Sequence, residues 1–280
     1  MRWTADTDLA SYAARVLPTL LRDPVRNNVA CSLIQARRDG LSAIEPDGLW
    51  LHANDGTDEV VAAALRTPPH GLLLTPMSDI AVDALADHMA GIEPQLPNAN
   101  GPIEVSRRFA ARYAELTGRP VTAGLGSRLF DLREVRAPIG VPGKLREAAN
   151  ADRDLLVAWS DAFGREAVPG EPQDPARPID MRLKTSGLLW LWERDGAAVS
   201  TAYLSPPVAG VMRVSGVYTP PELRGRGYAS ACVAAMSQVA LDFGADACML
   251  YTDLSNPTSN KIYQAIGYRP VDDAADWRFS

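Results

Sequence analysis

Short matches between the two halves of the chain constrain its fold more than any other feature. Leu-Trp-Leu at 49–51, followed by Asp-Gly at 55–56, recurs at 189–191 and 195–196. Each match is typical of a strand that enters a hairpin, because Asp-Gly supplies the backbone conformation of a tight turn. Matches at a common spacing indicate an internal repeat, so the sequence predicts two copies of one folding unit.

A second pair of matches lies ten residues further apart than the first. Tyr113 and the Arg-Pro-Val at 119–121 recur as Tyr263 and the Arg-Pro-Val at 269–271. The second copy is therefore expected to contain an insertion, which we place after the strand at 210–215. In the first copy the corresponding strand runs almost directly into a helix.

A segment rich in proline and glycine, 135–143, lies in the middle of the chain. Such a composition is typical of a linker. We therefore predict two domains, 1–138 and 143–280. A second irregular stretch, 168–178, is interpreted as a loop inside the second domain, because a helical pattern begins before it.

Hydrophobic periodicity predicts that the second domain is α/β. The expected strands are 144–148, 188–193, 197–204, 211–218, 247–252, 268–271 and 276–279, and the expected helices are 152–165, 229–243 and 257–266. In the helix at 229–243, apolar residues that include Phe243 recur at the spacing of one helical face. A strand, a loop, a helix and a strand thus form the centre of this domain.

The composition argues against several classes of protein. With a net charge of −6 and a pI near 5.2, the chain lacks the basic surface with which proteins neutralise nucleic-acid phosphates. No apolar stretch approaches the roughly 18 residues of a membrane span, and the N-terminus lacks the pattern of an export signal. We therefore expect a cytoplasmic protein with neither a nucleic-acid nor a membrane partner.

Cysteines and histidines are few and scattered. The cysteines show no CxxC spacing: they are Cys31, Cys232 and Cys248. The histidines form no HExxH motif: they are His52, His70 and His88. We therefore expect neither a disulfide framework nor a metal site.

The insertion carries the sequence Arg-Gly-Arg-Gly-Tyr-Ala at 224–229, between a strand and the start of a helix. Helix N-termini present unsatisfied N–H groups and a positive dipole, and glycine lets a ligand approach the backbone closely. Two arginines add further donors, so this segment is predicted to bind an anion. It is not a Walker A loop, because no Gly-Lys-Ser/Thr follows.

A dinucleotide-binding fingerprint is the competing interpretation of the same loop. Gly225 and Gly227 provide its first two glycines, and Asp253 ends the next strand, where a ribose-binding acid could lie. Ser230, however, stands where the third glycine belongs. Six residues also separate the strand from Gly225, whereas the dinucleotide turn follows its strand directly.

Two motifs in the second half resemble the GNAT superfamily of acyl-CoA-dependent N-acetyltransferases. The first is 224–229, which fits the signature Arg/Gln-x-x-Gly-x-Gly/Ala, and the second is the Asn…Tyr…Gly-aromatic segment at 256–268. Their order and spacing match the family, and the likeness extends over nearly all of this half. The resemblance implies the GNAT fold, with a central mixed and mostly antiparallel sheet flanked by helices, here duplicated in two halves.

The resemblance also implies a reaction and a site. Acetyl-CoA would donate its acetyl group to a primary amine that attacks directly, with Tyr263 as the general acid. The loop amides from Arg226 to Ala229 would bind the CoA pyrophosphate, and the strand end would pair with the pantetheine arm. The implied cofactor-binding residues are Val217, Tyr218, Thr219, Arg224, Gly225, Arg226, Gly227, Tyr228, Ala229 and Asn256.

The general base is unassigned. Many members of the family carry a glutamate on the strand before the loop, but the strand at 211–218 contains no carboxylate. Glu222, Asp253 and the terminal carboxylate of Ser280 are possible substitutes, and a chain of water molecules needs no residue. A backbone N–H near Val217 is the natural donor to the oxyanion.

The first half lacks the arginine and glycine loop. We therefore expect a degenerate copy that holds no CoA and instead shapes the acceptor cleft or an interface. Tyr113, the counterpart of Tyr263, would be a relic or a core residue. Trp3, Trp50 and Trp159 are candidates for lining an acceptor pocket, although tryptophans more often pack in a core.

Two further interpretations stay open beside the acetyltransferase. One is a catalytically silent CoA-binding sensor or interaction module, and the other is a nicotinamide-dependent enzyme. The expected acceptor is a small-molecule or peptide amine, and the acidic balance favours a cationic one. The chain is expected to be a monomer or a homodimer.

Overall fold

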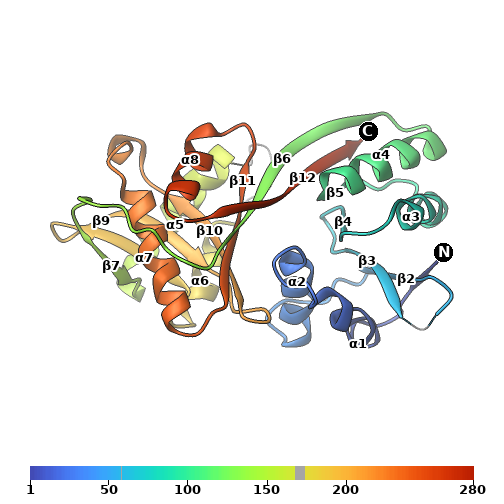
Figure 1. Ribbon diagram of the computed structural model, residues 1–280, viewed down its shortest axis with the longest axis horizontal. Helices are drawn as coiled ribbons and strands as arrows, with labels where there is room; N and C mark the ends of the chain where they lie inside the picture. Colours follow the sequence, from blue (N-terminus) through green and yellow to red (C-terminus); the bar gives the residue numbers. More distant parts are fainter. Residues whose placement is uncertain (58, 168–173) are drawn as a thin grey trace. The chain divides into compact units, whose positions relative to one another are not determined.

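The computed structural model describes residues 1–57, 59–167 and 174–280 (Figure 1). The chain is a mixed α/β protein that forms two compact units. Unit 1 contains Met1–Leu129, Thr252–Asn256 and Val271–Ser280, and unit 2 contains Phe130–Tyr251 and Pro257–Pro270.

The same order of helices and strands occurs twice along the chain. The first copy consists of β1 (Arg2–Ala5), α1 (Leu9–Leu20), α2 (Asn28–Arg38), β2 (Leu49–Asn54), β3 (Val60–Arg66), β4 (Leu72–Leu74), α3 (Asp79–Ile92), β5 (Asn98–Pro102), α4 (Ile103–Thr117) and β6 (Val121–Leu132). The second consists of β7 (Lys144–Glu147), α5 (Arg153–Ala167), α6 (Ala176–Leu183), β8 (Leu189–Arg194), β9 (Ala197–Leu204), β10 (Val211–Tyr218), α7 (Tyr228–Asp242), β11 (Ala247–Asp253), α8 (Pro257–Ala265) and β12 (Arg269–Phe279). Short 3-10 turns precede α5 and α7. The repeated order of elements agrees with the predicted duplication.

Strand pairing repeats as well. In unit 1, β1, β2, β3 and β4 pair antiparallel in that order, and β4 pairs parallel with β5. In unit 2, β7, β8, β9 and β10 pair antiparallel, and β10 pairs parallel with β11. Each unit therefore has the mixed and mostly antiparallel sheet that the sequence predicts.

The last strand of the chain belongs mainly to unit 1. β12 pairs antiparallel with β5, from Ala274 opposite Pro102 to Arg278 opposite Asn98, and Phe279 is buried in the core of unit 1. The two closing strands predicted at 268–271 and 276–279 form one continuous strand, so the predicted break between them is wrong. Of the residues between them, Ala274 and Ala275 pair with β5.

A reciprocal exchange occurs at the end of β6. Phe130 and Leu132 are buried in the core of unit 2, together with residues of α7. The compact units therefore do not coincide with the sequence repeats. The repeat boundaries 1–138 and 143–280 stay a prediction.

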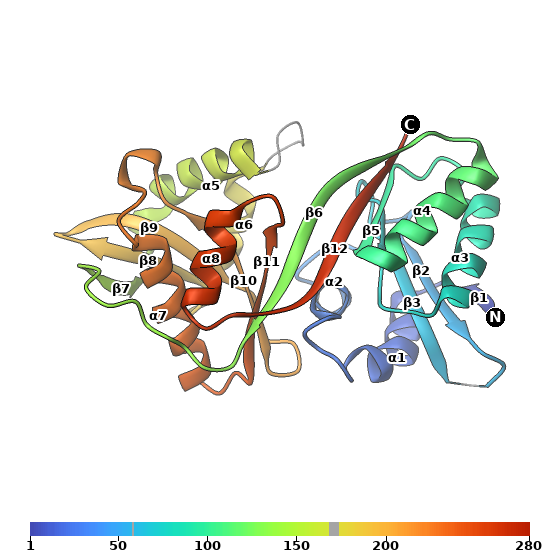
Figure 2. The same cartoon turned by 45° about the horizontal axis from the view of Figure 1, so that its top comes forward.

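Helices cover both faces of the sheet of unit 2 (Figure 2). Helix α7 packs on one face through residues such as Cys232 and Met236, and α5 and α6 pack on the other through Trp159 and Ile179. Phe243 does not join the buried face of α7. It follows the last helical residue as the C-cap, and 89% of its surface is exposed.

Candidate functional site

Strand β10 separates from β11 near its middle. Among the described residues, the parallel pairing runs from Val211–Ala247 to Arg213–Met249, whereas the pairing with β9 continues to the end of β10. The second half of β10 therefore presents a main-chain edge on the side away from β9. An extended ligand that contains amide groups can pair with such an edge.

A β-bulge interrupts the pairing of β10 with β9. Ser215 lies opposite Tyr203 and Tyr218 lies opposite Thr201, so that Gly216 and Val217 together face one residue of β9. Gly216 has a φ of +57°, and a Cβ there would lie 2.1 Å from the ring of Tyr203. The position therefore requires glycine for two reasons, and the bulge gives the peptide of Val217 a different direction from its neighbours.

The end of β10 is fixed by hydroxyl groups. Ser200 Oγ on β9 donates to the carbonyl of Tyr218 (3.0 Å) and lies 2.9 Å from Thr219 Oγ1. The Tyr218 and Thr219 side chains are buried, and the Tyr218 ring centroid lies 6.1 Å from that of Trp159. These two predicted site residues therefore offer a ligand their main chain rather than their side chains.

Arg224 is held within the protein by three contacts. Its Nε donates to the carbonyl of Thr219 (2.8 Å), its Nη2 lies 2.7 Å from a carboxylate oxygen of Glu166 on α5, and its guanidinium lies 5.6 Å from the centroid of the Tyr218 ring. The resemblance assigns Arg224 to cofactor binding. The observed contacts give its side chain a positioning role, since they connect the loop with the strand and helix beside it.

Two glycines shape the loop that leads into α7. Gly225 and Gly227 have φ values of +76° and +81°, in the left-handed region that favours glycine. Gly227 is the N-cap of α7, and no side chain caps this helix. The first amides of α7 therefore meet the helix dipole without a competing side-chain acceptor, which is the arrangement that binds phosphate.

Positive charge surrounds the start of α7. The buried Tyr228 hydroxyl accepts a 2.6 Å hydrogen bond from Arg194 Nη1, and Arg226 lies in the loop itself. The Arg194 guanidinium holds the pKa of the Tyr228 phenol below its usual value, and Arg226 lowers that pKa further. Sequence reasoning missed Arg194, which begins the β8–β9 turn formed by Asp195 (φ +51°) and Gly196 (φ +79°).

These features fit the pyrophosphate of CoA. The helix has no side-chain cap, Gly225 and Gly227 carry no side chain of their own, and Arg194 and Arg226 supply positive charge. Within the described residues no group of three or more His, Cys, Asp or Glu side chains could hold a metal ion. The glycines, the uncapped helix start and the two arginines suit a phosphate-bearing ligand.

Tyr263 projects from α8 into an aromatic cluster. Its ring centroid lies 6.4 Å from that of Phe130 and 5.9 Å from that of Tyr268. Burial raises the pKa of Tyr263 to about 12, so the phenol keeps its proton at physiological pH. It can therefore donate this proton but cannot act as a base in that range.

Unit 2 contains every predicted site residue except one. Val217 to Thr219, Arg224 to Ala229 and Tyr263 belong to unit 2, whereas Asn256 belongs to unit 1. The amide of Asn256 donates to the carbonyl of Asp253 (3.1 Å), at the turn between β11 and α8. A contact of Asn256 with a cofactor stays a prediction.

The candidate bases are engaged elsewhere or exposed. Asp253 Oδ1 accepts hydrogen bonds from the amide and the hydroxyl of Ser255, both 2.8 Å, and Ser280 donates its amide to the carbonyl of Pro120. Both residues belong to unit 1. Glu222 lies exposed in unit 2, within the turn that precedes the loop. No base is assigned.

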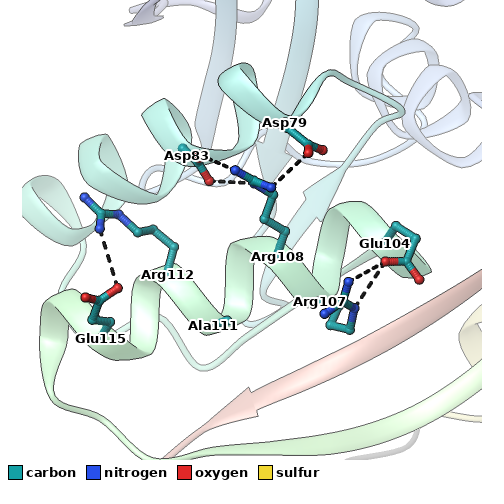
Figure 3. A pocket seen from close by; sticks show the side chains of 8 residues that line it. All are labelled: Asp79, Asp83, Glu104, Arg107, Arg108, Ala111, Arg112 and Glu115. Atoms are coloured by element: carbon teal, nitrogen blue, oxygen red, sulfur yellow. Dashed lines mark hydrogen bonds and ion pairs between the residues drawn. The ribbon is translucent and has the colours of Figure 1, made fainter.

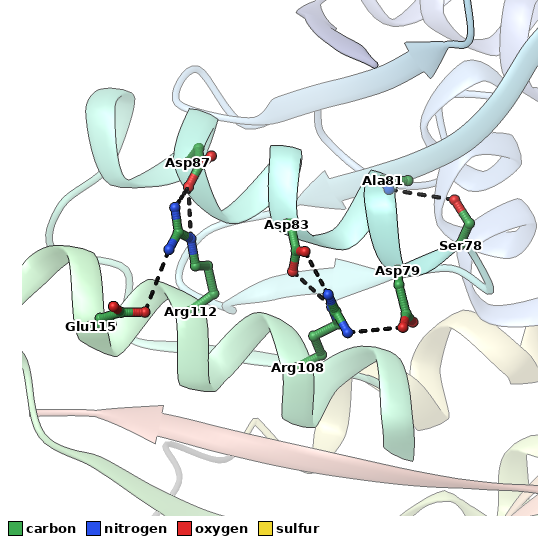
Figure 4. Close-up of polar contacts among 8 residues, drawn as sticks. All are labelled: Ser78, Asp79, Ala81, Asp83, Asp87, Arg108, Arg112 and Glu115. Carbon is green, nitrogen blue, oxygen red and sulfur yellow. Dashed lines mark hydrogen bonds and ion pairs between the residues drawn. The ribbon is translucent and has the colours of Figure 1, made fainter.

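The corresponding helix start in unit 1 is closed to anions. Only residues 75–78 connect β4 with α3, the Ser78 hydroxyl caps the helix by accepting from the amide of Ala81, and Asp79 begins its first turn (Figure 4). Arg108 of α4 contacts the Asp79 carboxylate at 2.8 Å. Among the described residues, the first turn of α3 therefore already carries a hydroxyl cap and a carboxylate, which do not favour an anionic ligand there.

A charged hollow between α3 and α4 is filled by ion pairs (Figure 3). Its arginines each contact a carboxylate: Arg107 contacts Glu104, Arg108 contacts Asp79 and Asp83, and Arg112 contacts Asp87 and Glu115. Because the charges of these exposed pairs compensate one another, the pairs offer little attraction to a charged ligand. The hollow is therefore interpreted as a helix–helix contact.

Tyr113 and the three tryptophans are core residues. The fully buried Tyr113 hydroxyl donates to the carbonyl of Glu93 (2.6 Å) and accepts from the amide of Leu96. Trp3, Trp50 and Trp159 are each at most 9% exposed. The prediction that Tyr113 has no catalytic role in the first copy agrees with these contacts.

In unit 2 a bulged strand leaves its neighbour and is followed by a glycine loop and a helix without a side-chain cap. Residues 153–268 match the family model described as the acetyltransferase (GNAT) family. The match covers most of the second half of the chain, so this part of the sequence is similar to the GNAT family. No curated protein sequence matches the chain.

Solved structures share the fold over the whole chain. They include an acetyltransferase of the GNAT family from Colwellia psychrerythraea (TM-score 0.65, 11% identity, covering 100% of both chains). A Drosophila protein has a TM-score of 0.67, with 10% identity over 99% of this chain and 98% of that one. A GCN5-related N-acetyltransferase from Sphaerobacter thermophilus has a TM-score of 0.63, with 19% identity over 99% and 95%. The likeness shows that the fold extends beyond the second half.

Proposed function

We propose that the chain is an N-acetyltransferase that uses acetyl-CoA, with its active site in unit 2. The observation that carries the proposal is the N-terminus of α7, which follows two glycines with positive φ and has no side-chain cap. In unit 1 the corresponding helix is capped by Ser78 and begins with Asp79. We therefore assign cofactor binding to the second copy and a supporting role to the first.

Each part of the site has a separate task in this proposal. Acetyl-CoA supplies an acetyl thioester, whose C–S bond breaks as the acceptor nitrogen forms a C–N bond. The amides from Arg226 to Ala229 hold the pyrophosphate, and the edge of β10 after Arg213 holds the pantetheine arm. The N–H of Val217, redirected by the bulge, stabilises the carbonyl oxygen as it gains negative charge.

Tyr263 provides the proton that the departing sulfur requires. Its pKa of about 12 keeps the phenol protonated. Because a thiol has a pKa of about 8.5, transfer of the proton to the sulfur requires that the position and local field of the site assist it. The strand at 211–218 has no carboxylate to receive the proton of the amine, so we propose that water receives it. An acceptor amine with a low pKa would then react fastest, because more of it is neutral at physiological pH.

Calorimetric titration with acetyl-CoA tests this function. The wild-type chain is expected to bind one acetyl-CoA, and Gly227→Glu to bind none, because it adds bulk and negative charge at the N-cap of α7. Gly91→Glu is the matched control, since Gly91 lies exposed on α3 with nothing within 4 Å of an added Cβ. Failure of the wild type to bind, or equal binding by Gly227→Glu, would reject the assignment.

A catalytically silent CoA-binding module is the second candidate. The absence of a carboxylate from 211–218 and the packing of Tyr263 among aromatic rings favour it. Release of the CoA thiol with a panel of primary amines separates the two candidates. Turnover that falls in Tyr263→Phe supports the enzyme, whereas binding without thiol release supports the silent module.

The remaining expectations concern partners and location. We propose a small-molecule or peptide amine as acceptor, no nucleic-acid or membrane partner, a monomeric or homodimeric state and a cytoplasmic location. Among the described helices, none combines the length and apolar character that crossing a membrane demands.

A further inference from the structure

Arg182, near the end of α6, has an incompletely satisfied side chain. Its Nη1 donates to the carbonyl of Pro178 (3.0 Å), but its buried Nε has no hydrogen-bond partner in the described part of the chain. Within that same part, no carboxylate lies at ion-pairing distance from Arg182. Buried guanidinium donors without partners are rare, and a polar ligand is one explanation for them.

The Tyr203 ring connects Arg182 with the bulge of β10. The guanidinium of Arg182 lies 5.1 Å from the centroid of this ring. A Cβ on Gly216 would lie 2.1 Å from carbon atoms of the same ring. Arg182 and the backbone at Gly216, near which we place the acyl group, therefore lie next to the same aromatic ring.

A second arginine adds positive charge on the same face of the sheet. Arg213 precedes Ser215 by two residues on β10, and Ser215 pairs with Tyr203, so Arg213 and Tyr203 extend from one face. Burial lowers the pKa of Arg213, and the nearby charge of Arg182 lowers it further. Arg213 therefore adds positive charge near Arg182 on this face of the sheet.

We propose that Arg182 binds a carboxylate of the acceptor, so that the acceptor is an amino acid or another amine that bears a carboxylate. This inference rests on the proposed acetyltransferase function and names the acceptor class of the same site. It replaces the cationic acceptor that the overall charge of −6 favours, because recognition depends on local charge. The carboxylate takes no part in bond making; it orients the amine toward the bulge at Gly216.

Matched acceptor pairs test the proposal. Each L-amino acid is compared with its own amide, which keeps the amine and replaces the carboxylate by a neutral group. The wild-type enzyme is expected to prefer the acid in kcat/KM, and Arg182→Gln to lower kcat/KM for the acid about 10- to 100-fold with little effect on the amide. Arg177→Gln, on the exposed side of the same helix, is the control and should change neither.

The KM for acetyl-CoA is measured in the same variants. It should stay unchanged in Arg182→Gln, and Arg182→Lys should recover part of the preference for the acid. Two results would overturn the acceptor class while leaving the acetyltransferase function intact. One is a wild-type kcat/KM that is as high for the amides as for the acids. The other is an equal loss of kcat/KM with acids and amides in Arg182→Gln.

A binding experiment without acetyl-CoA separates the two proposals. The Nε–H signals of ¹⁵N-labelled arginine are recorded while the same amino acids and amides are added, and the Arg182 signal is identified by its loss in Arg182→Gln. A shift with at least one acid and not with its amide supports the carboxylate site, even if calorimetry detects no acetyl-CoA binding. No shift with any acid overturns the carboxylate site, whatever the result for acetyl-CoA.

Discussion

Val141 Cγ2 lies 2.9 Å from the position that a Cβ on Gly227 would take. Gly225, two residues earlier, has open space around the same position, and both glycines have positive φ. We predict that Gly225→Ala and Gly227→Ala each lose about 1 kcal/mol of stability through backbone strain. Gly227→Ala should lose roughly 1–2 kcal/mol more through the contact with Val141.

Urea denaturation measures this difference in the free energy of unfolding between the two glycine variants. Val141→Ala provides the internal control, because it removes the clashing methyl groups. In the Val141→Ala background, Gly227→Ala should cost about as much as Gly225→Ala. Equal losses for the two glycine variants in the wild-type background would contradict the steric argument.

The ion pair between Arg224 and Glu166 is predicted to be less important than the other contacts of Arg224. Both side chains are about half exposed, so the pair contributes about 1 kcal/mol or less. Glu166→Gln should leave acetyl-CoA affinity within about threefold. Arg224→Ala should weaken it about tenfold, since the bond to the Thr219 carbonyl and the contact with Tyr218 are lost together. If the double variant Glu166→Gln/Arg224→Ala binds acetyl-CoA with the same affinity as Arg224→Ala, the ion pair is indeed less important than the other contacts of Arg224.

Phe279→Ala is predicted to destabilise unit 1, although residue 279 lies at the opposite end of the sequence from most of that unit. The Phe279 ring is buried, with its centroid 4.7 Å from that of Tyr113. Removing such a ring costs about 3–5 kcal/mol. Hydrogen exchange should accelerate in β5 and α4, whereas the exposed Phe243→Ala should change stability by about 0.5 kcal/mol or less. If Phe279→Ala accelerated hydrogen exchange only in α7 and β11, the assignment of Phe279 to the core of unit 1 would be contradicted.

The three buried cysteines predict a loss of stability in alkali. Burial raises the pKa of Cys31 and of Cys232 to about 12 and that of Cys248 to about 11. A thiol whose pKa is higher in the folded state keeps its full stabilising effect below the pKa of the unfolded thiol. The effect diminishes as the pH rises from there toward the folded value.

The free energy of unfolding should therefore fall between about pH 9 and 11, by roughly 1 kcal/mol per cysteine for each pH unit. Urea denaturation across this range measures the fall, and replacing the three cysteines by alanine should flatten it in proportion. In the native protein at pH 8 these thiols should react slowly with a thiol reagent. Rapid labelling of all three would show that they are more accessible than the structure indicates.

Local patterns in the second half predicted most of its helices and strands closely. The strands 197–204 and 211–218 have the expected bounds, and α7 begins at Tyr228, one residue before the predicted start. The bounds of these elements depend on hydrophobic periodicity and on turn residues close by in the sequence. They can therefore be predicted from the sequence alone. The Gly227 N-cap was predictable for the same reason.

Features that depend on distant partners were not predictable. The continuity of β12 depends on its pairing with β5, and the exposure of Phe243 depends on α7 ending one residue earlier. Two contacts form only because α5 and α6 pack on the sheet. Glu166 on α5 pairs with Arg224, and Arg182 on α6 lies over the Tyr203 ring. No spacing within the sequence reports these contacts.

The pairing of β12 with β5 has a consequence for biosynthesis. During translation, β1 to β5 leave the ribosome long before Val271–Ser280, and β5 then lacks the neighbour that it has in the native unit. Domains synthesised first normally fold first. Here the copy that is translated first is expected to complete its sheet only after residues 271–280 have left the ribosome.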